Sequence, residues 1–414
     1  MQRLGLASKS AFLIVAALFV TAVAVRAQKP AAAPAAAAQN SQGDIVLRGR
    51  QLVINHACGQ CHGGEDDPGA AGWLAGMGKP PVEFEIGPPP CGTEPGTKGC
   101  FKTRPRNLTP DNDTGLGRFT ERQIFNALRF GLRPENTPDV TITSTTPGQG
   151  NFPKIPHYLA PPMPWPGWRH LADSDLRAIA AYLKRGLKPV VNKVPDSEGP
   201  PDFWASGMTP SEIGEYPAPA FPAANERTPA AKDRARVLRG RQLVLDHDCV
   251  GCHRGPSPSS AGWLGGITSP SQEFVIGPCF QDEKAPCFHG RPKNLTPDKE
   301  TGLGRWTDQQ VFNALRYGLK PQDTPDVKIT STTPGTGNFP KDPHYLGPFM
   351  PWSAFRYMSD EELWSIVAYL RHIKPVSNKV ALSDDAPDHW ADTVAKLAPY
   401  PARPFPSANE VRRR

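Results

Sequence analysis

The pattern Cys58-Gly59-Gln60-Cys61-His62 occurs a second time in this chain, as Cys249-Val250-Gly251-Cys252-His253. Two cysteines separated by two residues and followed directly by a histidine are typical of covalent haem attachment, in which the thiols form thioethers and the histidine binds the iron. Zinc sites and thioredoxin-like pairs also use Cys-x-x-Cys, but neither explains a histidine after both pairs. The sequence therefore predicts two covalently attached haem c groups. The expected attachment residues are Cys58, Cys61, Cys249 and Cys252, and the expected proximal iron ligands are His62 and His253.

A long internal repeat organises the chain. Residues 107–111, Asn-Leu-Thr-Pro-Asp, recur as residues 294–298, and each copy follows one of the haem motifs. A period this long indicates a duplicated domain, because solenoid repeats run to about 20 to 50 residues. We predict one domain at 44–225 and a second at 236–410, joined by a polar linker at 226–235.

The N-terminus reads as a targeting segment. Arg3 and Lys9 precede an uncharged apolar run, and Val25-Arg26-Ala27 offers a cleavage site, as in a secretory signal peptide. We expect a signal peptide at 1–27, a periplasmic mature chain and an alanine- and proline-rich disordered tether at 28–43. An uncleaved leader would instead anchor the chain to the membrane, although its apolar run is shorter than the ~20 residues that a spanning helix needs.

Four cysteines lie outside the haem motifs: Cys91, Cys100, Cys279 and Cys287. An even remainder in an exported protein implies disulfides. Because each predicted domain holds its own close pair, we expect Cys91 to pair with Cys100 and Cys279 with Cys287.

Composition favours a small helical core with long irregular loops. The 49 prolines and 38 glycines among 414 residues confine helices to a few windows, and no run alternates strongly enough to require a sheet. Capping boxes mark helix starts at Thr120, Thr307 and Ser359. The net charge of +7 is not gathered into a basic run, so we expect no nucleic-acid partner. The expected helices lie at 45–56, 120–131 and 173–184, and again at 237–247, 307–318 and 360–371.

The sixth iron ligand decides between electron transfer and chemistry at the metal. Met163 and Met350 occupy matching Met-Pro-Trp segments, and the flanking prolines stiffen each loop. We expect these two methionines to complete the iron coordination. His157 and His344 also recur and are the rival ligands, which would give a lower potential. His56 and His247 recur too, close to the attachment cysteines. The structural role expected for all four histidines is a hydrogen bond to haem carboxylates or to loop backbone, or a place at the surface.

The order of these features resembles class I cytochrome c: an N-terminal helix running into Cys-x-x-Cys-His, a later methionine, and a terminal helix with Ala-Tyr-Leu. The resemblance covers both predicted domains. It implies a mostly α fold of two tandem cytochrome c domains with long disulfide-bearing loops. It also implies that the first and last helices cross closely, through Gly49 against Tyr182 and Gly240 against Tyr369.

Residues 294–307, followed by Met-Pro-Trp and the helix start at Ser359, resemble cytochrome subunits of bacterial membrane-associated dehydrogenases. That resemblance implies a periplasmic dihaem carrier that relays single electrons between a dehydrogenase or quinol-oxidising complex and a terminal acceptor, with no catalytic residues of its own. A dihaem peroxidase or a sulfur-compound dehydrogenase, with a labile sixth ligand at one iron, is the enzyme alternative. A subunit whose loops mainly bind a partner is a third reading.

Overall fold

The computed structural model describes residues 42–77, 84–86, 100–197, 208–276, 288–347, 349–383 and 397–412. The predicted leader and nearly all of the tether lie outside these residues, as do Cys91, Cys279 and Cys287. Cys100 is buried and disulfide-bonded. Both predicted disulfide pairings stay predictions, because at least one partner of each lies outside the described part of the chain.

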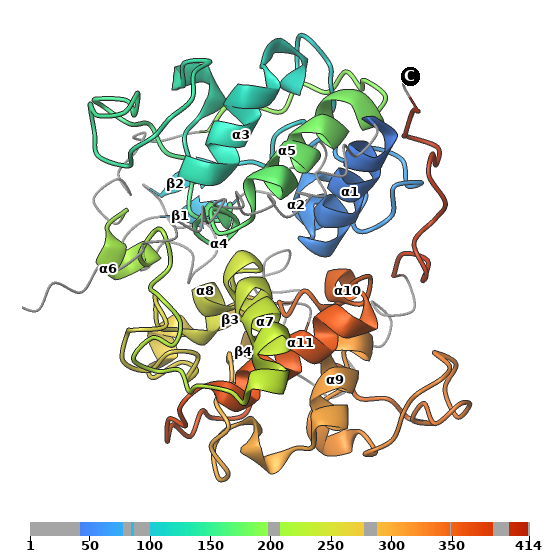
Figure 1. Ribbon diagram of the computed structural model, residues 1–414. Helices are drawn as coiled ribbons and strands as arrows, with labels where there is room; N and C mark the ends of the chain where they lie inside the picture. Colours follow the sequence, from blue (N-terminus) through green and yellow to red (C-terminus); the bar gives the residue numbers. More distant parts are fainter. Residues whose placement is uncertain are drawn as a thin grey trace, which may run out of the picture. The chain divides into compact units, whose positions relative to one another are not determined.

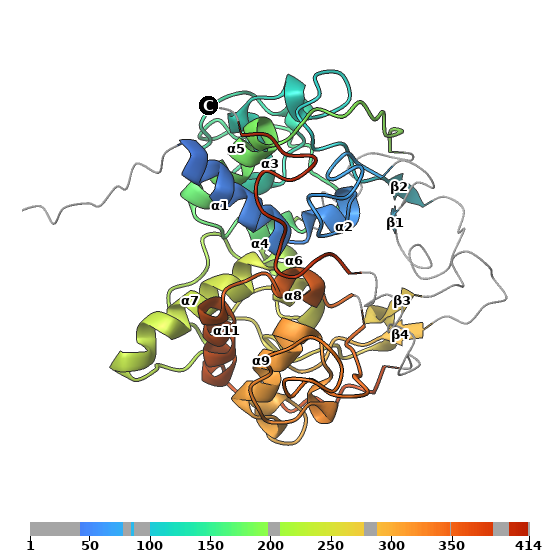
Figure 2. The same cartoon turned by 90° about the vertical axis from the view of Figure 1, so that its right-hand side faces the viewer.

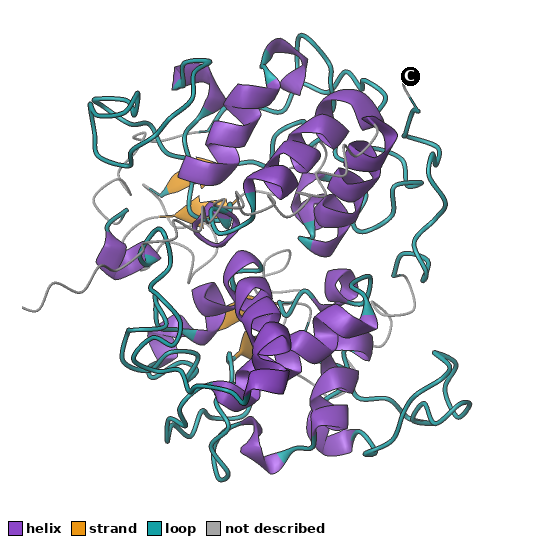
Figure 3. Cartoon of the chain, viewed as in Figure 1, coloured by secondary structure: helices purple, strands orange, loops and turns teal. Residues whose placement is uncertain are grey.

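The described chain is mostly helical, as expected (Figure 1, Figure 3). Five helices occur in the first part and recur in the same order in the second. The first set is α1 (Gln42–Asn55), α2 (Cys58–His62), α3 (Glu121–Phe130), α4 (Trp165–Trp168) and α5 (Asp173–Ala181). The second set is α7 (Arg234–Asp246), α8 (Cys249–His253), α9 (Asp308–Tyr317), α10 (Trp352–Phe355) and α11 (Asp360–His372). A short helix, α6 (Pro210–Ile213), lies between the sets.

Two small hairpins interrupt the long loops, which the sequence did not predict. Strand β1 (Phe84–Ile86) pairs antiparallel with β2 (Phe101–Thr103), and β3 (Phe274–Ile276) pairs antiparallel with β4 (Phe288–Gly290). Each strand has three residues, too few for alternation to be recognised in the sequence. Among the described residues, none of the helices combines the length and the apolar character needed to span a membrane.

The predicted capping boxes are confirmed. The hydroxyls of Thr120, Thr307 and Ser359 accept hydrogen bonds from the backbone at the third helical position, and the Gln or Glu side chain there accepts from the capping residue. Ala172, before α5, makes no such side-chain bond. Helix α5 is followed by a π-helical turn at Tyr182–Gly186 where α11 continues as a regular helix.

Close helix crossings form the two cores, and the predicted contact pairs are confirmed. A Cβ atom on Gly49 would lie 1.8 Å from the carbonyl oxygen of Ala178 and 2.8 Å from Cβ of Tyr182, so α1 and α5 touch at backbone distance. Gly240 meets Ser365 and Tyr369 with the same two distances where α7 crosses α11. Only glycine leaves room for backbones this close.

The C-terminal segment of each copy of the repeat packs against the other copy. The segment ending at Glu226 follows the first set of helices, yet Glu226 is 4% exposed and its carboxylate lies 2.6 Å from Arg241 of α7. The segment ending at Glu410 follows the second set, yet it returns to α1, where Glu410 lies 2.6 Å from Arg50. Figures 1 and 2 both show this last segment running past α1. The C-terminal segment of each half, here called its tail, therefore packs into the other half and closes it. The predicted linker 226–235 begins at Glu226, which is buried in the second half.

Candidate functional site

Both haem motifs fold as short helices placed by the helix before them. Helix α2 starts after Ala57, and α8 after Asp248, and both of these residues have a left-handed backbone, with φ of 57° and 50°. This turn ends the long helix and redirects the chain. It brings His62 and His253 into the interior, where each is 9% exposed.

A backbone hydrogen bond orients each of the two motif histidines. Nδ1 of His62 lies 2.7 Å from the backbone oxygen of Arg106, and Nδ1 of His253 lies 2.7 Å from that of Lys293. Because a carbonyl oxygen only accepts, Nδ1 must carry the hydrogen, which leaves the lone pair on Nε2 free for a metal. Burial lowers the pKa of both imidazoles, which favours the neutral form that binds iron.

The four motif cysteines are unpaired thiols. Burial raises the pKa of Cys58 and of Cys252 to about 12, and it raises the pKa of Cys61 and Cys249 as well. A four-thiolate zinc site would bring all four sulfurs together around one ion. Among the described residues the four sulfurs do not gather into a metal-binding cluster. Thioether formation, which leaves the sulfur uncharged, suits these surroundings.

One cavity of about 1550 Å³ contains the predicted sites of both halves. It exceeds the ~300 to 1,000 Å³ typical of a pocket for a single small ligand, so it has room for more than one large group. Most other lining residues are apolar, as the macrocycle of haem requires. The predicted site residues that line the cavity are Cys58, Cys61, His62, Met163, Cys249, Cys252, His253 and Met350.

Three contacts fix each methionine loop. Trp165, directly after the Met163-Pro164 pair, stacks on Tyr158 at a centroid distance of 5.9 Å and packs over Gly131 at the end of α3. Leu132 and Tyr158 form a β-bridge that ties the loop to the same place. Trp352, Tyr345, Gly318 and Leu319 repeat this arrangement beside Met350. The packed tryptophan thus sets the position of each methionine.

The rival histidines lie away from the cavity. Neither His157 nor His344 is among the residues that line it. His344 is part-exposed, and its Nδ1 lies 3.3 Å from a carboxylate oxygen of Asp323. The structure thus brings the methionines, and not these histidines, to the cavity shared with His62 and His253.

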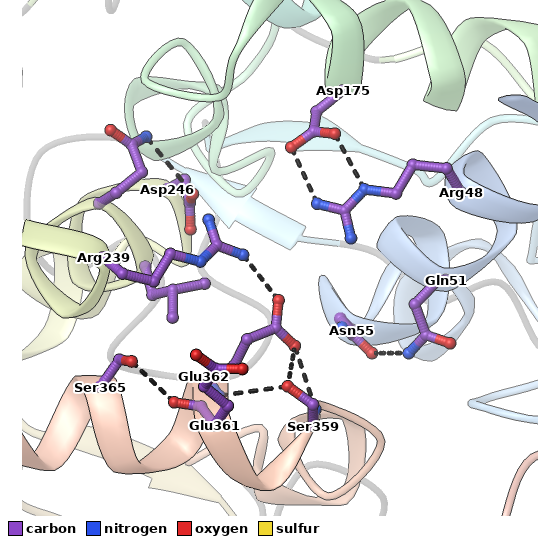
Figure 4. Close-up of polar contacts among 12 residues, drawn as sticks. Arg48, Gln51, Asn55, Asp175, Arg239, Asp246, Ser359, Glu361, Glu362 and Ser365 are labelled. Atoms are coloured by element: carbon purple, nitrogen blue, oxygen red, sulfur yellow. Dashed lines mark hydrogen bonds and ion pairs between the residues drawn. The ribbon is translucent and has the colours of Figure 1, made fainter. Parts of the chain in front are cut away.

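Two matching ion pairs, one in each half, were not predicted from the sequence. Arg48 of α1 pairs with Asp175 of α5 at 2.9 Å, and Arg239 of α7 pairs with Glu362 of α11 at 2.6 Å (Figure 4). These are corresponding positions of the repeat. Electrostatic attraction to Glu362 and Asp246 also acts on Arg48 and, after the hydrogen bond to Asp175, helps to raise its pKa. Because these charged residues recur at matching positions of the repeat, the two ion pairs could have been recognised in the sequence.

Two short helices that each carry an attachment motif and end in a buried histidine, together with the cavity they share, fit covalently bound haem c. Comparison with known proteins finds relatives that are cytochrome c subunits. The chain is 26% identical over 272 residues to the cytochrome c subunit of the quinone-dependent alcohol dehydrogenase of Gluconacetobacter polyoxogenes, covering 65% of this chain and 47% of that subunit. It is 26% identical over 356 residues to the gluconate 2-dehydrogenase cytochrome c subunit of Pantoea cypripedii, covering 85% and 65%.

A third relative is the fructose dehydrogenase cytochrome subunit of Gluconobacter japonicus, 25% identical over 371 residues, covering 88% of this chain and 59% of that subunit. The chain spans about half the length of the first of these relatives. No family model matches the chain. Its relatives are thus cytochrome c subunits of dehydrogenases, at modest identity.

Proposed function

We propose that this protein is an exported dihaem cytochrome c that relays single electrons from a dehydrogenase to a further acceptor. The observation that carries the proposal is the shared cavity, lined by both attachment motifs and by both methionines. The relatives support the dehydrogenase as electron donor, because they are subunits of such enzymes. Periplasmic location rests on the N-terminal sequence alone.

In this proposal His62 and Met163 bind one iron, and His253 and Met350 bind the other. Bound haem would supply one-electron redox chemistry, and a His and Met ligand pair would raise its potential. The protein holds each imidazole through its Nδ1 atom and positions each sulfur through the packed tryptophan beside it. An iron held by both ligands would have no open position, which would suit a carrier rather than a peroxidase.

Replacing Met163 or Met350 with alanine tests the axial assignment. We expect each variant to lose one sulfur ligand, which lowers the potential of that haem and lets cyanide bind to it. The measurements are haem content per chain, the far-red absorption band that reports methionine bound to oxidised iron, and cyanide titration. The unaltered protein should contain two haems and bind no cyanide rapidly.

Met358→Leu is the matched control. Met358 is 2% exposed in the second core, and Leu171 occupies the corresponding position of the first half. This variant should keep the spectrum and both potentials. Rapid reduction of hydrogen peroxide by the unaltered protein, or an unchanged spectrum in both alanine variants, would reject the six-coordinate carrier.

A further inference from the structure

Two histidines outside the proposed iron ligands stack against each other at the cavity. His56 directly follows α1 and His247 directly follows α7, at corresponding positions of the repeat. Their ring centroids lie 4.2 Å apart, with an angle of 21° between the ring planes. Both rings line the cavity, and Trp168 and Phe355 contact them edge-on. The stack therefore joins the two halves next to both attachment motifs.

Each ring has one nitrogen in use and one without a partner. Nδ1 of His56 lies 2.8 Å from the backbone oxygen of Leu52, and Nδ1 of His247 lies 3.0 Å from that of Leu243. Both Nδ1 atoms therefore carry hydrogen, and both Nε2 atoms hold a lone pair in the neutral ring. Within the described part of the chain, these two Nε2 atoms are buried and have no hydrogen-bond partner.

A metal ion does not suit the stack. The lone pair of a histidine nitrogen lies in the plane of its ring, and a zinc–nitrogen bond is about 2.0 to 2.1 Å long. Planes that are 4.2 Å apart at the centroids and inclined by only 21° do not meet within that distance of both rings. A proton, unlike a bridging metal ion, binds to a single Nε2 atom, so the stacked geometry permits protonation.

The two halves differ in the residue that precedes each histidine. Asp246 lies 2.7 Å from Nδ1 of His247, whereas Asn55, also buried, precedes His56. Burial by itself raises the pKa of Asp246, but the hydrogen bond and the charge of His247 bring it below its ordinary value. The two rings are therefore unequal, because a buried carboxylate lies beside only one of them and can stabilise a positive charge on the stack.

We propose that the stacked pair His56–His247, with Asp246, is a redox-linked proton site that binds one proton when the cavity gains an electron. This inference rests on the proposed haem-bearing carrier. The electron comes from the redox partner and the proton from solvent, and one N–H bond forms at Nε2 with no leaving group. A second proton is opposed by repulsion between two stacked cations.

Burial, followed by the charge of His247, lowers the pKa of His56 to about 4, so the His56 ring is neutral at pH 7 in the oxidised protein. An added electron in the same low-dielectric cavity raises the proton affinity by on the order of one pKa unit. The other titratable and charged groups that interact with the stack or with Asp246 are Arg48 on α1, Asp175 on α5, Arg239 on α7 and His170 after α4.

The test is the pH dependence of both reduction potentials between about pH 4 and about pH 8. In the unaltered protein we expect at least one potential to fall with rising pH in the acidic part of this range. If one proton binds with each electron, the potential falls by at most about 59 mV per pH unit, which corresponds to a tenfold change in the equilibrium constant. His56→Phe combined with His247→Phe keeps two stacked rings but removes both Nε2 atoms, and the acidic slope should disappear.

Two reciprocal variants keep the test decisive if the phenylalanine variant does not fold. Asp246→Asn gives the second half the residue of the first and should move the slope to lower pH. Asn55→Asp does the opposite and should move it to higher pH. Asp248→Ala removes a neighbouring carboxyl group and should leave the acidic slope in place.

A flat pH profile in the unaltered protein, or an acidic slope that persists in the phenylalanine variant, would overturn the proposal. So would reciprocal variants that leave the slope where it was. The absorption spectrum separates this failure from that of the carrier itself: two haems with methionine bound to iron show that the proposed function stands whatever the pH profile is.

Discussion

Asp248 marks the clearest chemical difference between two otherwise matching haem motifs. It occupies the position of Ala57 in the first half, directly before the attachment cysteine, and it lines the cavity. From the sequence, an acidic residue here is expected to lower the potential of the C-terminal haem, and that expectation stays a prediction. Burial raises the pKa of Asp248 to about 7, so the carboxyl group is only partly ionised at neutral pH.

The electrostatic effect of Asp248 should therefore depend on pH. Above about pH 7 the ionised carboxylate favours the more positive, oxidised haem, so the C-terminal potential should fall as pH rises through 7. Asp248→Ala, which copies Ala57, should remove this neutral-range fall and raise the potential. A redox titration of both haems across this range checks the expectation. An unchanged C-terminal potential in the variant would contradict it.

The same group should affect stability with a definite sign. The folded state holds a proton that the unfolded chain releases above its ordinary pKa of 3.8, so the free energy of unfolding falls as pH rises from about 4 to about 7. Asp248→Ala should remove this pH-dependent decrease in the free energy of unfolding, which is on the order of a few kcal/mol. Both effects come from one carboxyl group whose charged form is disfavoured by burial more than Arg169 favours it.

Exchange of the two tail segments is the main structural feature at the scale of elements. In each half one carboxylate contacts an arginine from the first helix and the hydroxyl of a tyrosine from the last. Tyr182 donates to Glu410 at 2.6 Å, and Tyr369 donates to Glu226 at 2.7 Å. Trp73 and Trp263 donate to the same hydroxyls at 3.0 Å. The tails therefore complete the crossings of α1 with α5 and of α7 with α11.

Replacing Glu410 with glutamine should strongly destabilise the protein. The variant keeps the shape but leaves the buried guanidinium of Arg50 without its counter-charge, a change that typically costs about 3 to 5 kcal/mol. Glu226→Gln should cost a similar amount through Arg241. Denaturant unfolding measures both. Glu135→Gln is the control, because its pair with Arg118 is exposed on both sides and should contribute little.

Local elements were predictable from the sequence, but the tail exchange was not. Capping boxes such as that at Thr120 depend on residues three positions apart, so the sequence shows them directly. The contact of Arg50 with Glu410 joins residues 360 positions apart, and a buried glutamate has no local pattern that distinguishes it from an exposed one. The attachment motifs were recognisable because the chemistry fixes their spacing. The stack of His56 on His247 depends on how the halves meet, which no local pattern contains.

At the scale of the whole molecule, exchanged tails should couple the unfolding of the two halves. If each half is closed by a segment of the other, loss of either one releases a carboxylate and its backbone contacts from the other. We therefore expect one calorimetric transition for residues 42–412, although the repeat alone would suggest two. Two well-separated transitions would contradict this coupling. The control is cleavage of the chain between the halves after folding, which should leave them associated.

The exchange of tails also determines which half of the protein can be completed first during synthesis. Synthesis proceeds from the N-terminus, so the segment that closes the second half, ending at Glu226, already exists when α7 and α11 are made. The segment that closes the first half ends at Glu410, which follows all the helices of the second set. The half that is synthesised first is thus the last to be finished, and a chain that stops early leaves its first haem site open however well the rest has folded.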